Sequence, residues 1–499
     1  MSLAIAYTRA QEGIHAPSVS VEVHISNGLP CFTIVGLPEA AVKESKDRVR
    51  SALLNSHLDF PQRRITVNLA PADLPKEGGR YDLAIAIAIL AASGQIPSAQ
   101  LDQYEFIGEL ALSGQLRSVR GCLSAAIACG KSQRALILPE HNAREATLCK
   151  QTQLYSASNL LRVCAHIHNR EALPAPVADI QQQAQYDKDL SDVKGQYQAR
   201  RALEIAATGG HNILLFGPPG TGKSMLASRL PSILPPLQEE QALEVAAIHS
   251  LAKQYKREHW LTRKYRAPHH SSSAVALVGG GSQPRPGEIS LAHHGVLFLD
   301  ELPEFPRRAL EVLREPLESG QVSICRARAQ VDYPADFQLV AAMNPCPCGF
   351  GDDGSNRCRC TTLQKTRYRN KISGPLLDRI DLHVQVNAIP ITDLQGKPEG
   401  ESSATVRARV IKNHDTQLAR QSTRNARLSG MELHQHCLLG QAEKTLLAEA
   451  MERLKLSGRA YDRILRVSRT IADISGSERI ETPHISEALA YRSLDRQPS

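Results

Sequence analysis

The sequence predicts an α/β protein of about three domains, because two blocks of alternating strand and helix patterns precede a helical block. In residues 1–170, short apolar runs such as VSVEVHI and RITVNLA alternate with helical stretches such as YDLAIAIAILAAS. Residues 171–190 mix proline, glutamine and charge without periodicity, so we expect a linker there. Strands and helices alternate again over 191–397, and helical spacing continues through 398–499.

The composition indicates a globular protein of a reducing compartment. Apolar residues make up 42% of the chain, and eleven cysteines in 499 residues are too few for a secreted disulfide scaffold. The N-terminus lacks a positively charged segment followed by a long apolar stretch. The longest apolar run, at 83–92, is about half of what spans a bilayer. We therefore expect a cytoplasmic protein with no membrane partner.

The net charge of +8 is unevenly distributed. Residues 404–430 hold six lysines and arginines against one acid, Asp415. Such a run is typical either of a solvated helix face or of a surface for a polyanionic partner, and the sequence leaves both open.

A glycine-rich loop between an apolar strand and a helix predicts a phosphate site. In NILLFGPPGTGKSMLASRL (212–230), four residues fit the pattern G-x-x-x-x-G-K-[ST]. Glycines let backbone N–H groups turn toward phosphate oxygens, lysine reaches the β- and γ-phosphates, and the serine hydroxyl ligates Mg²⁺. The predicted nucleotide residues are Gly217, Pro218, Pro219, Gly220, Thr221, Gly222, Lys223, Ser224 and Met225.

An acidic pair at the end of a second strand completes the prediction of an ATPase that uses ATP and Mg²⁺. GVLFLDELPEF (295–305) ends its apolar run at Asp300 and Glu301. The aspartate is suited to hold Mg²⁺, and the glutamate to orient and polarise the attacking water. A surface Asp-Glu pair is common, but its occurrence after the phosphate loop makes the combination specific.

Further polar residues follow later elements of the same block. The strand FQLVAAMN (337–344) ends on Asn344, where an amide can sense the γ-phosphate. Arg379, in SGPLLDRIDLHVQV, is suited to reach the nucleotide of a neighbouring subunit. The helix at 457–474 carries arginines three and four residues apart, of which Arg459 and then Arg466 are candidates to lean over the phosphates; otherwise they are surface charges.

Four cysteines gather in NPCPCGFGDDGSNRCRC (344–360) with the spacing C-x-C-x₉-C-x-C. Four thiolates complete a closed tetrahedral Zn²⁺ site, which is structural because it lacks an open coordination position. Reduced free thiols and a redox switch are the alternatives. We therefore expect a structural zinc held by Cys346, Cys348, Cys358 and Cys360.

These motifs resemble the magnesium-chelatase-like branch of AAA+ ATPases, and more closely the ComM/YifB competence protein family, over essentially the whole chain. GPPGTGKS, VLFLDE, AAMNP, SGPLLDRIDLHV and SGRAYDRILRVSRTIAD carry the resemblance. It implies a homohexamer with ATP between subunits, acting as a helicase or branch-migration motor on DNA in natural transformation, with recombination proteins as possible partners.

The resemblance also assigns roles residue by residue. Lys223 and Ser224 correspond to Walker A, and Asp300 and Glu301 to Walker B. Asn344 corresponds to sensor 1, Arg379 to the arginine finger acting in trans, and Arg459 to sensor 2.

The N-terminal domain resembles the fold of Lon protease domains and of ribosomal protein S5-like domains, as in the ChlI subunit of magnesium chelatase. Arg80 occupies the place of the Lon serine, and Ser124 the place of the catalytic lysine. Because nucleophile and base are both replaced, this implies a proteolytically inactive platform for binding or assembly.

Two inserts of the predicted ATPase core are candidate DNA-contacting loops. The segment 263–290 begins with a basic lead-in, and 320–337 reads as a hairpin with arginines at its turn. Arginines there would bind backbone phosphates without reading sequence. Exposed hairpin charges and ordinary loop packing are the alternatives. The candidate DNA residues are Lys264, Arg266, His269, His270, Arg326 and Arg328.

Two other functions compete with the DNA motor. One is a chelatase motor that drives insertion of Mg²⁺ into a porphyrin. The other is a protein-directed remodelling machine, suggested by the Lon-like domain and weakened by Arg80 and Ser124.

Overall fold

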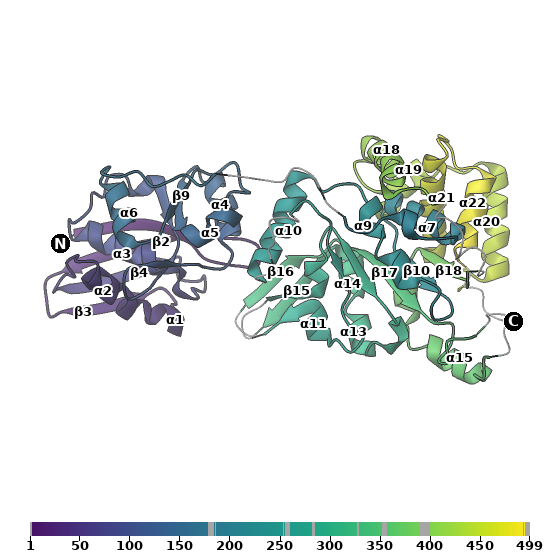
Figure 1. The fold of residues 1–499 in the computed structure, drawn as a ribbon, viewed down its shortest axis with the longest axis horizontal. Helices are drawn as coiled ribbons and strands as arrows, with labels where there is room; N and C mark the ends of the chain where they lie inside the picture. Colours follow the sequence, from purple (N-terminus) through teal and green to yellow (C-terminus); the bar gives the residue numbers. More distant parts are fainter. Residues whose placement is uncertain are drawn as a thin grey trace. The chain divides into compact units, whose positions relative to one another are not determined.

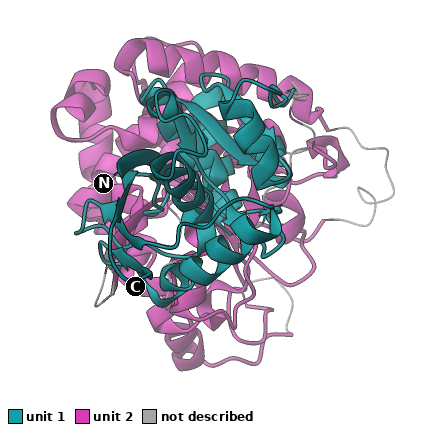
Figure 2. Ribbon diagram, turned by 90° about the vertical axis from the view of Figure 1, so that its left-hand side faces the viewer, with its two compact units in different colours: residues 1–182, 239–260 teal, residues 183–238, 261–499 magenta. Residues whose placement is uncertain are grey.

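The computed structural model describes residues 2–177, 184, 186–252, 254, 260–281, 285–326, 329–351, 357–389, 400–492 and 494. The chain divides into two compact units (Figure 2): residues 1–182 with 239–260, and residues 183–238 with 261–499. The mixed α/β class and the helical C-terminal region that the sequence predicted are confirmed. No helix in the described ranges is both long and apolar enough to cross a membrane.

A seven-stranded mixed sheet forms the first unit (Figure 1), in the order β3-β4-β2-β1-β5-β8-β9. β1 pairs antiparallel with β2, and β2 with β4, whereas the other pairs are parallel. Alternate residues of β2 are buried, as expected for a strand with one face on the core. The strands are β1 (Ser2–Arg9), β2 (Ser18–Ser26), β3 (Cys31–Val35), β4 (Arg64–Ala70), β5 (Tyr104–Phe106), β8 (Ala135–Pro139) and β9 (Leu154–Ala157), with a small hairpin of β6 (Glu109–Leu110) and β7 (Leu116–Arg117).

The apolar run of the first unit is its central helix, α3 (Asp82–Ala92), which packs on β1 and β2. Ten of its eleven residues are buried, so the run is explained by burial on all sides rather than by a membrane. The remaining helices are α1 (Ala40–Lys43), α2 (Ser45–Asn55), α4 (Cys122–Lys131), α5 (Glu140–Ala146) and α6 (Leu160–Ile167).

One helix of the predicted ATPase block packs with the first unit instead. α10 (Glu239–Leu251) lies against α4, and the Ser250 hydroxyl donates to Glu145 Oε2 at 2.6 Å. Lys150 pairs with Glu239 at 2.8 Å. The predicted boundaries of 1–170 and 191–397 did not anticipate this, because the contacts of α10 are made with residues about a hundred positions earlier in the chain.

The second unit is built on a five-stranded parallel sheet in the order β11-β14-β17-β10-β18. Its central three strands, β14, β17 and β10, are neighbours, so their carboxyl ends meet at one edge of the sheet. The strands are β10 (Ile213–Phe216), β11 (Tyr265–Arg266), β14 (Val296–Leu299), β17 (Gln338–Met343) and β18 (Leu382–Gln385).

Short helices and two hairpins surround this sheet. The hairpin predicted over 320–337 is confirmed as β15 (Gln321–Arg326) paired with β16 (Ala329–Pro334), and a second is formed by β12 (Gly279–Gly280) and β13 (Arg285–Pro286). The helices are α7 (Tyr197–Gly209), α8 (Lys223–Ala227), α9 (Leu230–Ile233), α11 (Ala274–Val278), α12 (Glu288–Leu291), α13 (Arg307–Glu311), α14 (Arg314–Ser319), α15 (Thr362–Arg369) and α16 (Gly374–Leu377).

Five helices form the C-terminal part of the second unit: α18 (Ser403–Gln421), α19 (Gly430–His436), α20 (Gln441–Leu454), α21 (Gly458–Ile474) and α22 (Thr482–Ala490). The basic run at 404–430 belongs here, and its charges are used inside the fold. Arg420 pairs with Asp473 at 2.6 Å, and both Arg424 and Arg427 pair with Asp336. The acidic partners lie outside residues 404–430. The sequence therefore suggested an excess of positive charge there, which ion pairs in the fold largely balance.

Candidate nucleotide site and cysteine knuckle

The glycine-rich loop joins β10 to α8 at the carboxyl edge of the parallel sheet. Gly220 and Gly222 have φ angles of +78° and +90°, in the left-handed region that other residues rarely adopt. A side chain at Gly217 would collide with the backbone oxygen of Val386 on the chain that leaves β18. The pattern therefore needs glycine for backbone conformation at two positions and for close approach at a third.

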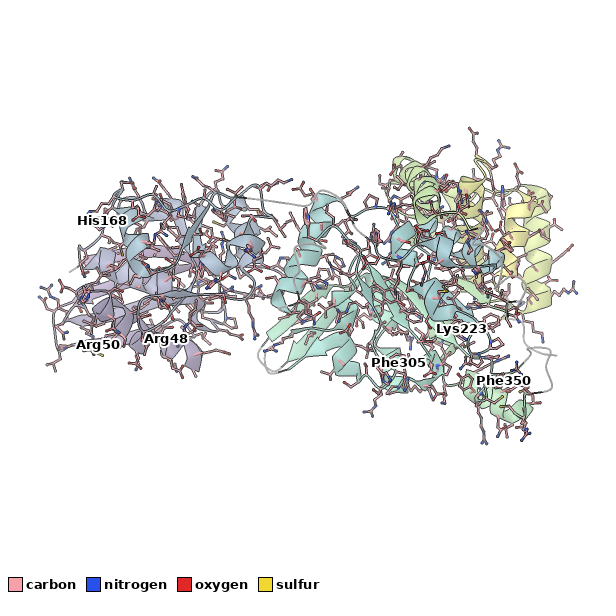
Figure 3. The ribbon with its side chains drawn as sticks, in the orientation of Figure 1. Arg48, Arg50, His168, Lys223, Phe305 and Phe350 are labelled. Carbon is pink, nitrogen blue, oxygen red and sulfur yellow. The ribbon has the colours of Figure 1, made fainter. Side chains whose placement is uncertain are left out.

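Lys223, labelled in Figure 3, is the first residue of α8 and directly follows this loop. Its Nζ donates to Gly217 O at 2.7 Å, to Pro218 O at 2.8 Å and to Asn344 Oδ1 at 3.2 Å. Burial lowers the pKa of Lys223, and the nearby carboxylates of Asp300 and Glu301 oppose that shift. The ammonium is thus fixed among oxygen acceptors, where phosphate oxygens could compete for it.

Ser224 and Asp300 are in direct contact across the sheet edge. The Ser224 hydroxyl donates to Asp300 Oδ2 at 2.7 Å. Mg²⁺ takes hard oxygen ligands, and a hydroxyl beside a carboxylate supplies two of them without requiring the backbone to move. The donor set therefore fits a magnesium ion that arrives with a nucleotide.

The adjacent acid, Glu301, is held by a histidine. Its own N–H donates to Asp300 Oδ1 at 2.9 Å, and its φ of +52° lies in the left-handed region. His270 Nδ1 lies 3.1 Å from Glu301 Oε2, and the His269 ring packs on the His270 ring with centroids 4.1 Å apart. Sequence reasoning assigned both histidines to DNA, yet in the structure they stand beside the acid assigned to water activation.

Asn344 directly follows β17 and reaches the same cluster. Its Oδ1 accepts from Lys223, and its backbone lies close enough to the Tyr368 phenol of α15 to lower the pKa of that group. Burial raises the pKa of Tyr368 to about 12, so the phenol stays neutral. The structure thus brings together the predicted loop, acidic pair and sensor residue.

Arg379 is predicted correctly as a residue between a helix and a strand, but its guanidinium is engaged elsewhere. It is 7% exposed, donates Nη1 to Pro375 O at 2.6 Å and pairs through Nη2 with Glu318. Burial lowers its pKa. None of these partners belongs to the loop at 217–225 or to the acidic pair.

The arginines of α21 divide into three that are used in packing and one that is not. Arg463 pairs with Asp381 at 2.7 Å, Arg466 donates Nε to Leu428 O at 2.7 Å, and Arg469 pairs with Asp473 at 2.9 Å. Arg459 is exposed and forms no hydrogen bond or ion pair with any residue that the structure describes.

The candidate DNA residues that the structure describes are engaged in different contacts. Arg266 makes two hydrogen bonds to the Glu288 carboxylate, at 2.6 and 2.7 Å, and the backbone of Lys264 accepts from Val296 N next to the sheet. His269 and His270 lie by Glu301. The strand containing Arg326 is described, but its side chain and all of Arg328 lie outside the described residues.

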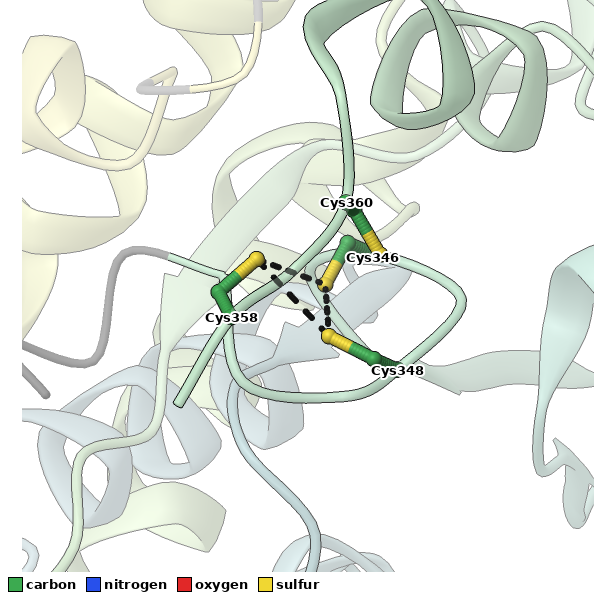
Figure 4. Close-up of side chains that lie close together, drawn as sticks. All are labelled: Cys346, Cys348, Cys358 and Cys360. Carbon is green, nitrogen blue, oxygen red and sulfur yellow. Dashed lines mark hydrogen bonds between the residues drawn. The ribbon is translucent and has the colours of Figure 1, made fainter. Parts of the chain in front are cut away.

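The four cysteines of 346–360 converge on one point (Figure 4), and we call them the cysteine knuckle. All four Sγ atoms lie within 4.8 Å of one another, and Cys358 Sγ is 3.8 Å from that of Cys346 and 3.7 Å from that of Cys348. Tetrahedral bonds of about 2.3 Å to zinc need sulfurs about 3.8 Å apart. Gly351 N–H donates to Cys346 Sγ at 3.1 Å, a contact that favours a thiolate.

The two residues at the Lon-type positions of the first unit make no catalytic pair. Arg80 is 6% exposed and donates to Arg120 O at 2.6 Å and to Gln11 Oε1 at 3.2 Å. The Ser124 hydroxyl is buried and has no hydrogen-bond partner within the described ranges. A guanidinium fixed on a carbonyl supplies no nucleophile, and the serine has no base beside it.

The parallel sheet, the glycine-rich loop, the acidic strand end and the helical C-terminal part define a P-loop nucleotide-binding protein of the AAA+ class. Family comparison agrees along the chain: the family described as magnesium chelatase, subunit ChlI, matches residues 189–394. Its two companions, subunit ChlI of Mg-chelatase and the ChlI C-terminal part, match 21–142 and 400–492.

Comparison with individual relatives identifies the family to which the chain belongs within this class. The chain is 53% identical to the uncharacterized protein YifB of Salmonella typhimurium and 52% identical to competence protein ComM of Haemophilus influenzae, each over 99% of this chain and 98% of the relative. Lon protease 2 of Bacillus subtilis is 27% identical over 34% of this chain and 35% of its own length. The chain belongs to the ComM/YifB family of magnesium-chelatase-like AAA+ proteins.

Proposed function

We propose that the protein is an ATP-driven motor that moves on DNA, as a helicase or branch-migration enzyme that aids recombination in natural transformation. The observation that carries ATP hydrolysis is the contact of Ser224 with Asp300 beside Lys223 and Asn344. The name of the relative ComM, a competence protein, supports DNA as the substrate.

Each side chain of the cluster has a distinct task in this proposal. Ser224 and Asp300 would hold Mg²⁺, which neutralises charge on the phosphates when it is bound. Lys223 exchanges carbonyl oxygens for β- and γ-phosphate oxygens. Glu301 orients the attacking water, and Asn344 fixes its position relative to the transferred phosphate.

Arg379 and Arg459 are the two arginines that complete the nucleotide site in this proposal. In a homohexamer Arg379 would leave Glu318 and reach the nucleotide of the neighbouring subunit, where a guanidinium stabilises transferring charge. Arg459 is the α21 arginine without a partner among the described residues, which supports it over Arg466 as the sensor on the C-terminal helices.

We infer that the cysteine knuckle holds a structural Zn²⁺, supported by its sulfur spacing. About one zinc per chain is expected by elemental analysis, and chelation is expected to lower the melting temperature by about 5 °C. Cys358→Ser should do the same, whereas Cys325→Ser, at an exposed cysteine outside the knuckle, should not. Far less than one zinc per chain, with unchanged melting, contradicts the metal site.

One assay separates the DNA motor from its two competitors. ATPase rates are measured with no addition, with single-stranded DNA, with a branched DNA and with an unfolded protein. The proposal expects stimulation by DNA, lost at high salt because phosphate contacts release counterions. Stimulation by the unfolded protein alone would favour the remodelling machine. Absence of any DNA stimulation or of salt-sensitive DNA binding would contradict the motor and leave the chelatase reading.

A further inference from the structure

A strongly basic segment follows the second half of the cysteine knuckle. Between residues 357 and 371 the chain has six basic residues and no acidic one. Every residue of this segment is described, and α15 occupies its middle, at the periphery of the second unit in Figure 1. The six are Arg357, Arg359, Lys365, Arg367, Arg369 and Lys371; we call them the knuckle basic face.

Two of these side chains are exposed and uncommitted. Arg359 and Arg367 form no hydrogen bond or ion pair with any residue in the described part of the chain. By contrast, Lys371 pairs with Glu304 at 3.0 Å, and the Arg357 guanidinium lies over the Phe350 ring, 4.4 Å from its centroid. The basic residues of 404–430 differ in this respect, since acids elsewhere in the fold pair with most of them.

The segment presents these charges from a fixed scaffold. At the start of α15, Gln364 N–H donates to the Thr361 hydroxyl at 3.3 Å, and Thr361 N–H donates to Gln364 Oε1 at 2.9 Å. Tyr368, the residue after Arg367, is buried, and its phenol lies close to the Asn344 backbone. Arg359 lies between Cys358 and Cys360, so the knuckle holds that end of the segment.

We propose that the knuckle basic face binds the phosphate backbone of DNA, an inference that rests on the proposed function as a DNA motor. Arginine is suited to phosphate because its planar guanidinium can donate two parallel hydrogen bonds. A protein partner or a lipid surface would need an apolar contact area. Leu363 is the single large apolar side chain that this segment exposes.

The same scaffold connects the bound DNA to the ATP site. Lys371 pairs with Glu304, three residues after Glu301, and the Tyr368 phenol lies close to the backbone of Asn344. DNA bound at residues 357–371 would therefore contact a segment that also pairs with Glu304 and lies close to the sensor residue. Stimulation of ATP hydrolysis by DNA should depend on the knuckle basic face.

The test is the double substitution Arg359→Ala with Arg367→Ala in the full-length protein. Affinity for a labelled single strand and for a forked DNA is measured over a range of salt concentrations. We expect affinity to fall at least about tenfold at 100 mM salt, and the slope of log affinity against log salt to flatten by about 1.4–1.8, the loss of two phosphate contacts. The ratio of DNA-stimulated to basal ATPase should fall in parallel.

Two further variants keep the result interpretable. Lys444→Ala with Arg453→Ala removes the same charge from exposed positions on α20, and should leave affinity and slope as in the wild type. Arg359→Lys with Arg367→Lys keeps both charges, and should restore most of the affinity.

Four outcomes would overturn the proposal. The first is a double alanine variant with wild-type DNA affinity and slope, and the second is an equal loss of DNA affinity in the α20 control. The third is failure of the lysine pair to restore DNA affinity. The fourth is a double alanine variant that loses binding to phosphatidylglycerol vesicles, measured in parallel, but keeps its binding to DNA. Any of these leaves the DNA motor intact if the wild-type protein binds DNA. Failure of the wild-type protein itself to bind DNA would instead contradict the proposed function.

Discussion

The two units share the α/β class, but a buried charge pair of the first unit contrasts with the charges that gather at a sheet edge of the second. In the first unit, Arg9 and Glu105 form a closed pair at 2.6 Å, with side chains 6% and 0% exposed. In the second unit, Ser224, Asp300 and Glu301 meet at a sheet edge, where the Glu301 side chain is 50% exposed. Charges that satisfy each other inside a core depend on each other because either one alone would be buried unpaired, whereas charges that gather at an accessible edge are available to a ligand.

Arg379 tests this comparison most severely, because its side chain is buried like that of Arg9 whereas its partner Glu318 is 61% exposed. If it completes a neighbour's nucleotide site, Arg379→Ala should lower the ATPase rate by about 10³-fold or more. A mixture with Lys223→Ala should regain activity, since some interfaces then combine an intact loop with an intact arginine. Hydrolysis rates of the separate and mixed proteins check this.

The control is Arg463→Ala, which breaks the ion pair with Asp381. Arg463 has no proposed role at the nucleotide of a neighbouring subunit. This substitution should lower stability and show no rescue on mixing with Lys223→Ala. If Arg379→Ala behaves in the same way although it assembles normally, Arg379 is a structural residue and the shared site is wrong.

Glu301→Gln should reduce ATP turnover by about 10³-fold, because an amide cannot polarise the attacking water. ATP binding should persist, since Lys223, Ser224 and Asp300 are unchanged. Lys223→Ala, in contrast, should weaken ATP binding itself. Equilibrium binding of a labelled nucleotide, measured beside turnover, separates the two effects. Loss of binding in Glu301→Gln would show that the acid shapes the pocket rather than the chemistry.

Glu105→Gln applies the comparison to the first unit. Removing one partner of a buried pair leaves Arg9 without its counter-charge, so the free energy of unfolding of this unit should fall by about 3 kcal/mol. Turnover per folded molecule should stay unchanged. Denaturant unfolding followed beside ATPase activity measures both.

Glu44→Gln is the matched control. Its carboxylate is 72% exposed and lies 3.7 Å from Arg48, so its loss should cost less than about 1 kcal/mol. Equal destabilisation by both substitutions would show that burial does not distinguish the two pairs.

The difference between residues at a sheet edge and charges paired inside the fold also explains which parts of the site could be predicted from the sequence. Asp300 and Asn344 directly follow apolar strands, and Lys223 follows a third strand through the glycine-rich loop. Neighbouring parallel strands bring such ends together, so the meeting of these residues could be predicted. The partners of the basic run, such as Asp473 and Asp336, lie 53 and 88 residues away from Arg420 and Arg424. No local sequence pattern indicates a pairing over such a distance. For residues 404–430 the sequence therefore left open both a solvated helix face and a surface for a polyanionic partner.

The contact of His270 with Glu301 was missed for the same reason. The histidines follow a basic lead-in, which favoured a DNA loop, and the chain segment that returns them to the acid has no sequence signature. Likewise Arg266 belongs to that basic lead-in, yet its guanidinium forms an ion pair with the Glu288 carboxylate on α12. The sequence predicted which residues lie together at the sheet edge more reliably than which charges are paired.

His270→Ala is expected to have the smallest effect and gives the finest test of the contrast between the units. The imidazole restricts a half-exposed carboxylate without burying it, so it acts as a positioning residue and not as half of a closed pair. Its loss should lower kcat about tenfold with little change in the KM for ATP, since the phosphate-binding groups remain. His269→Ala removes the neighbouring ring and its hydrogen bond with the Ser271 hydroxyl, and should change kcat less than about twofold. If both substitutions have equal effects, or if His270→Ala lowers the melting temperature as Glu105→Gln does, the histidine supports the fold and does not orient the acid.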